Sequence, residues 1–135
     1  MKHLFKSLFL LTLLCFFYLP ALSGGDNTQK ENVIKSLLIE NNNMVVITVD
    51  GLCCRNCGIG IGKKVCKLNF IDTEKLPKGV KIDRINGLLS IALKENEEVD
   101  YEAIYTAIRK AGYKPKALFK KDSDNKINKS DIVKK

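Results

Sequence analysis

Cys54 and Cys57 are two thiols three positions apart, in a segment that leads from a predicted strand into a predicted helix. An apolar run at residues 45–49 precedes them, a short turn at residues 50–52 separates run and cysteines, and apolar residues at helical spacing follow. Two thiols on such a turn can converge on one soft metal ion or close into a disulfide. The helix start and the Arg55 guanidinium both favour the thiolate, which binds metals and attacks disulfides. The pattern therefore indicates a metal site or a redox site.

The number of other cysteine and histidine side chains limits which kind of metal site the chain can form. Cys53 adds a third thiol beside the pair, either as a further ligand or as a bystander, whereas Cys66 lies nine residues beyond Cys57 and is expected to be a packed thiol. A structural zinc site uses four ligands, and the single His lies in the first segment of the chain. Thiolates favour soft ions. Two or three thiolates on an exposed loop suit a low-coordinate ion that can be handed on.

Residues 1–23 have the pattern of a secretory signal peptide. A basic start is followed by an apolar run of about 12 residues at 8–19 and by small residues, Ala21 and Ser23, where a signal peptidase would cut. The run is shorter than the roughly 20 apolar residues that span a bilayer. We expect cleavage and a periplasmic or secreted product; the alternative is a membrane anchor formed by residues 8–19.

The chain is basic, with 23 Lys and Arg against 15 Asp and Glu. Its formal net charge of +8 would fall to +6 when Lys2 and Lys6 leave with the signal. A basic surface is ordinarily just solvated, but it can also dock to an acidic partner. A nucleic-acid partner is not expected, because basic and aromatic residues do not interleave and no recognition helix is evident.

Residues 24–43 are predicted to be a linker, within which residues 33–40 suit a helix or a strand. The elements predicted after it are a strand at 45–49, a helix at 56–69, strands at 80–85 and 88–94, a helix from 101 to 111, and a strand at 113–119. Asn86-Gly87 predicts a type I′ hairpin between the two middle strands. Residues 120–135 are highly charged and are predicted to be disordered.

Two signals mark the second helix and one marks the last strand. Asp100 is the expected N-cap, and Gly112 the expected C-terminal stop. Pro115 cannot donate to a strand ladder, so it predicts that the last strand lies at a sheet edge. The element order predicts an α+β, ferredoxin-like βαββαβ domain at residues 44–119, with a four-stranded antiparallel sheet and two helices on one face. Its first and third strands, the most apolar, would be central.

Three motifs resemble those of the heavy-metal-associated domain family, and they occur in the family's order. Residues 51–57 resemble its Gly-Met-x-Cys-x-x-Cys loop, residues 79–80 its Gly-Val before the second strand, and residues 111–113 its Ala-Gly-Tyr after the second helix. The resemblance covers about residues 44–119. The family includes small copper chaperones, the N-terminal modules of copper-pumping ATPases, and periplasmic mercury-binding proteins, which the exported layout resembles most.

The resemblance implies Cys54 and Cys57 as metal ligands, and Tyr113 as an aromatic residue near the metal. Together with coordination chemistry it favours one Cu(I) or Hg(II) ion over Zn(II). It implies a metal-binding protein that transfers its ion, rather than an enzyme, with an acidic metal-donating or metal-accepting membrane transporter or similar domain as partner and no small-molecule substrate.

The chain departs from the family pattern at three places. Leu52 stands where the family usually has a buried Met, a volume-conserving replacement. Cys53 stands in place of Thr or Ser, and the connection from Cys57 to Gly79 is longer than usual. Two alternatives remain: a thiol–disulfide redox protein that uses Cys54 and Cys57, or a structural or adaptor domain in which these two form a disulfide.

Overall fold

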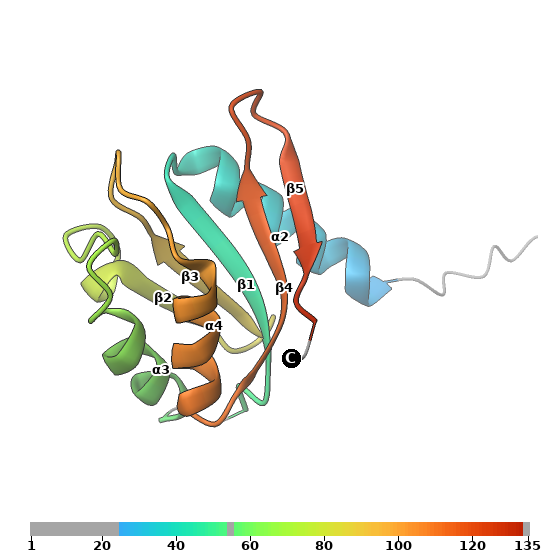
Figure 1. Ribbon diagram of the computed structural model, residues 1–135. Coiled ribbons are helices and arrows are strands. Elements are labelled where there is room, and N and C mark those ends of the chain that lie inside the picture. The colour runs from blue at the N-terminus through green and yellow to red at the C-terminus, as the bar shows by residue number, and fades with distance from the viewer. Residues whose placement is uncertain (1–24, 54–55, 134–135) are drawn as a thin grey trace, which may run out of the picture.

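The strands and helices follow the predicted order, with one helix added before them and one strand after them. The computed structural model describes residues 25–53 and 56–133 (Figure 1). In chain order it has α2 (Gly25–Glu40), β1 (Met44–Asp50), α3 (Cys57–Val65), a 3-10 turn (Pro77–Gly79), β2 (Val80–Asp83), β3 (Leu88–Ala92), α4 (Tyr101–Lys110), β4 (Lys114–Lys121) and β5 (Ile127–Asp131). The predicted signal peptide at residues 1–23 lies outside the described residues.

The sheet is antiparallel, with strand order β2-β3-β1-β4-β5. Within the predicted four strands, β1 and β3 are central, as their apolar sequences indicated. Val45 on β1 pairs with Ile91 on β3 and with Lys120 on β4. The predicted α+β class and four-strand order are therefore confirmed, while the sheet has five strands rather than four.

Helices α3 and α4 cover one face of the sheet, as predicted for a ferredoxin-like arrangement (Figure 1). Ile61 of α3 and Ile104 and Ile108 of α4 are fully buried in the same core as Val45 and Ile47. The predicted first helix was too long, because α3 ends at Val65 and not at residue 69. The chain leaves the helix there because Phe70 and Ile71 turn back into the core, where Ile71 bridges to Leu93.

Helix α2 covers the opposite face, where the sequence predicted a linker with either a helix or a strand at residues 33–40. Its Ile34 and Leu38 pack against Val46, Leu88 and Phe119 from three different strands. Apolar residues at positions 33, 34, 37 and 38 form a stripe along one side of the helix, so burial on the sheet stabilises it. The sheet is therefore covered on both faces, which explains why β1 is almost entirely apolar.

The tail at residues 120–135, predicted to be disordered, is described through residue 133 and is ordered there. It completes β4 and then forms β5, whose residues pair from Lys121↔Ile127 to Ala117↔Asp131. Asn125, with φ 59°, turns the chain between the two strands. The prediction that β4 is an edge strand is therefore wrong, although Pro115 itself lies beyond the end of the pairing with β5.

The β2–β3 hairpin is also not the two-residue type I′ turn that Asn86-Gly87 predicted. Strand β2 ends at Asp83, which pairs with Leu88 across a four-residue loop, and within that loop only Gly87 has a positive φ. The Asp83 carboxylate accepts hydrogen bonds from the Ile85 and Asn86 backbone N–H groups at 3.0 and 3.1 Å. These bonds favour the longer loop over the tight turn.

Candidate metal-binding loop

The cysteine loop connects β1 to α3 and is anchored at its start. Gly51 has φ +89°, a conformation that glycine adopts readily. The next residue, Leu52, is buried in the core shared with α3 and α4. Leu52 is thus buried, and the next residue, Cys53, is exposed.

The structure describes only some of the predicted site residues. Cys53 and Cys66 are free thiols, the first exposed and the second half-buried at the end of α3. Cys57 is the first residue of α3, but its side chain, like all of Cys54 and Arg55, lies outside the described residues. Within residues 25–53 and 56–133, no three His, Cys, Asp or Glu side chains form a metal-binding group. The pair Cys54 and Cys57 stays a prediction.

The N-terminus of α3 is electrostatically suited to a thiolate. Asn56 precedes the helix with helical backbone angles, φ −87° and ψ −13°, and its side chain accepts no hydrogen bond from the helix. The first turn contains no acidic residue. The positive end of the helix dipole is therefore not offset by a side-chain cap or a carboxylate, and it favours negative charge at the position of Cys57.

Gly58 allows α3 to pack closely on the sheet, a role that the sequence analysis did not predict. The sequence has glycine at positions 58, 60 and 62, which by itself indicates only a low helix propensity. In the structure a Cβ at Gly58 would collide with Cδ1 of Ile82 on β2. Glycine directly after Cys57 therefore allows α3 to approach β2 closely, and the signal available in the sequence was a small residue beside a predicted ligand.

Tyr113 lies against the base of the loop. Its ring atom Cδ1 is 3.5 Å from the position that a Cβ on Gly51 would take. The end of α4 sets this place: the Gly112 N–H donates to the Arg109 carbonyl at 2.9 Å, and the Tyr113 N–H donates to the Ile108 carbonyl at 3.2 Å. This pair of bonds is a Schellman motif, so the predicted stop at Gly112 is confirmed. At the other end, the Asp100 side chain accepts from the Ala103 N–H, which confirms the predicted N-cap.

The β2–β3 hairpin lies at the same end of the sheet as the cysteine loop. The Val49 N–H, two residues before Gly51, donates to the Gly87 carbonyl at 2.9 Å. Burial raises the pKa of the Asp83 carboxyl, but the hydrogen bonds from Asn86 and Ile85 outweigh it, so the pKa of Asp83 is lowered. The charged carboxylate therefore holds the hairpin loop in place.

The described architecture is an α+β sheet fold whose β1–α3 loop holds a Cys-x-x-Cys motif. The chain is similar to the solved structure of a CopZ metallochaperone, with a TM-score of 0.45 and 17% sequence identity, over 53% of this chain and 97% of that chain. No protein-family model and no curated protein matches the sequence. One fold supports many functions, so a similarity at this level does not indicate the function of this chain. The function has to be argued from the residues of the loop.

Among the described helices, none is long and apolar enough to cross a membrane.

Proposed function

We propose that this chain binds one soft metal ion, Cu(I) or Hg(II), through the thiolates of Cys54 and Cys57 and passes it to another protein. The observation that supports this most is the position of the motif: it lies in the short connection from β1 to α3, and Cys57 is the first residue of the helix. Thiolates at this place gain from the uncapped helix start, and two of them match the low coordination numbers of soft ions. Zn(II) is a less favourable occupant.

The described residues on either side of the motif support a metal site near the surface. Leu52 anchors one side in the core, and the Tyr113 ring packs over Gly51. Cys53 is exposed beside the pair, so it is free to act as an additional ligand during transfer or to remain a bystander. An exposed site with few ligands releases its ion more readily than a closed four-ligand site.

The partner we propose is an acidic metal-donating or metal-accepting domain. The groove between α3 and α4 is lined by three lysines and two carboxylates: Lys64, Lys67, Lys110, Asp100 and Glu102. Ile59, two residues after Cys57, is 54% exposed. These three lysines and the exposed apolar side chain of Ile59 suit docking by charge followed by apolar contact, and such docking weakens as salt rises.

The proposed protein is a binding protein rather than an enzyme, and it works outside the cytoplasm after cleavage near residue 23. The support for export is the basic start and apolar run of residues 1–23. Anchoring by residues 8–19 is the alternative, and N-terminal sequencing of the expressed protein distinguishes the two.

Anaerobic titration of the reduced chain against Cu(I), Hg(II) and Zn(II), with a competing chelator, tests the metal proposal. Cys54→Ser and Cys57→Ser should each lower Cu(I) and Hg(II) affinity by orders of magnitude. Cys66→Ser is the matched control, since it removes a thiol outside the loop and should bind like the wild type. Binding should release protons and weaken as the pH falls, because the ligands must be thiolates.

Three results would overturn or redirect this proposal. Unchanged affinity in both Cys54→Ser and Cys57→Ser would refute it. A wild type that binds no metal but reduces or oxidises a test disulfide would establish the redox alternative. A wild type that does neither and keeps a Cys54–Cys57 disulfide under mild reductant would establish the structural alternative.

A further inference from the structure

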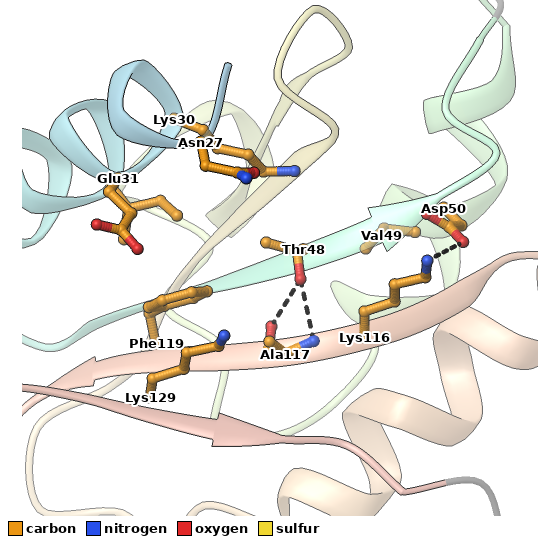
Figure 2. A pocket seen from close by; sticks show the side chains of 11 residues that line it. Asn27, Lys30, Glu31, Thr48, Val49, Asp50, Lys116, Ala117, Phe119 and Lys129 are labelled. Carbon is orange, nitrogen blue, oxygen red and sulfur yellow. Dashed lines mark hydrogen bonds and ion pairs between the residues drawn. The ribbon is translucent and has the colours of Figure 1, made fainter. Parts of the chain in front are cut away.

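A pocket lies between α2 and the sheet, on the face opposite α3 and α4 (Figure 2). Its volume is about 470 Å³, within the range of small-molecule sites. The predicted four-stranded domain would not contain it, because one wall is the added helix α2 and another is the added strand β5. Three lysines line it from three different elements: Lys30 from α2, Lys116 from β4 and Lys129 from β5.

The lysines differ in how far their charge is already offset. Lys116 Nζ lies 2.7 Å from Asp50 Oδ2, a short ion pair at one end of the pocket whose side chains are also more than half exposed (Figure 2). Lys129 Nζ is 3.6 Å from Asp131 Oδ1, at a mainly exposed pair that water screens. Lys30 has no ion pair within the described part of the chain. The one further carboxylate in the lining, Glu31, lies at the far end of the pocket from Asp50 (Figure 2).

The rest of the lining has an apolar side and a closed polar floor. The Phe119 ring borders the pocket, with Lys129 Nζ 6.0 Å from the ring centre. At the floor the Thr48 hydroxyl accepts from the Ala117 N–H at 3.0 Å and donates to the Ala117 carbonyl at 3.4 Å. Since the hydroxyl already donates its one proton, the hydrogen-bond donors left for an anionic ligand are the ammonium groups and the amide of Asn27.

We propose that this pocket binds an organic anion, with its phosphate or carboxylate held by Lys30 and Lys129 and its apolar body against Phe119. Charge-assisted hydrogen bonds from ammonium groups would hold the anionic group, and the apolar body gains from leaving water. A soluble metabolite and the headgroup of an anionic lipid both offer this chemistry. The site is separate from the cysteine loop, so it does not depend on the metal proposal.

Two-dimensional amide NMR of the full-length chain tests the proposal, with inorganic phosphate and phenyl phosphate as probes at constant ionic strength. Phenyl phosphate should shift the amide signals of Thr48 and Ala117 saturably, with a dissociation constant in the millimolar range or below. Inorganic phosphate should bind more weakly, because it lacks the apolar body. The double variant Lys30→Gln/Lys129→Gln should weaken phenyl phosphate binding at least about tenfold, the loss that one charge-assisted hydrogen bond implies.

The matched control is Lys35→Gln/Lys126→Gln, which removes the same charge from exposed positions outside the pocket lining. It should bind phenyl phosphate like the wild type. Sedimentation with vesicles of phosphatidylcholine, with and without phosphatidylglycerol, separates the two sources: pelleting that needs the anionic lipid and is lost in Lys30→Gln/Lys129→Gln identifies a headgroup. The proposal is overturned if neither phenyl phosphate nor anionic vesicles bind in a manner that depends on Lys30 and Lys129.

Discussion

Replacing Leu38 with alanine measures how firmly α2 is held on the sheet. The Leu38 side chain is 0% exposed and packs with Val46, Leu88 and Phe119. The change removes three buried carbon atoms, which at about 0.8 kcal/mol each is a loss of about 2.4 kcal/mol. The paired strands below cannot collapse fully into the space, so a cavity penalty adds to this. We expect a total loss of about 3 to 4 kcal/mol in the free energy of unfolding.

Urea denaturation of the full-length chain, followed by circular dichroism, provides the assay. Ile39→Ala is the matched control, because Ile39 is the next residue of the same helix but is 68% exposed. Its free energy of unfolding should change by no more than about 0.5 kcal/mol. Leu38→Ala should also lower the Tm by roughly 10 to 15 °C in a chain of this size.

Equal behaviour of the two variants would refute this reasoning. If Leu38→Ala costs no more than Ile39→Ala, α2 is not packed on the sheet in solution. The pocket between α2 and the sheet would then lack one of its walls.

Two further predictions concern the hairpin and the turn before β2. The pKa of Asp83 is lowered in the folded chain below its ordinary value of 3.8, so its stabilisation is present above that value and is lost as the pH falls through the lower folded pKa. The stability advantage of wild type over Asp83→Asn, measured by urea denaturation, should therefore shrink between about pH 5 and pH 2, and an advantage that does not change with pH would contradict it. Gly79→Ala should cost about 2 kcal/mol, because φ is +78° and the new Cβ would lie 2.8 Å from the Asp72 carbonyl oxygen. Gly60→Ala is the control, because a Cβ at Gly60 would have no neighbour within 4 Å, and it should be neutral or stabilising. Thermal melts followed by circular dichroism compare both variants with the wild type.

Local signals in the sequence were sufficient where the interaction they describe is itself local. Asp100 was predicted to cap α4, and its carboxylate accepts from an amide three residues away. Gly112 was predicted to end that helix, and both bonds of its motif join residues no more than five positions apart. The central position of β1 and β3 followed from their apolar composition, since buried strands exclude polar side chains on both faces.

The cysteine motif was recognised from residue types and spacing, but the packing of the following helix on the sheet was not. The sequence indicated two thiols at a strand-to-helix turn, and the structure places Cys57 at the first position of α3. That Gly58 lets this helix approach Ile82 depends on which strand lies beneath it. No local pattern contains that information, because the two residues are 24 positions apart.

Residues 25–40 and 120–131 show what only the tertiary structure decided. The second segment is mostly polar and the first has a single apolar stripe, so neither buries enough apolar surface to be stable alone. Helix α2 is ordered because Ile34 and Leu38 meet a sheet face assembled from β1, β3 and β4. Strand β5 is ordered because the edge of β4 offers it backbone partners. In both cases the stabilising surface exists only after distant strands have paired, so the free energy that decides the conformation of these segments lies outside their own sequence.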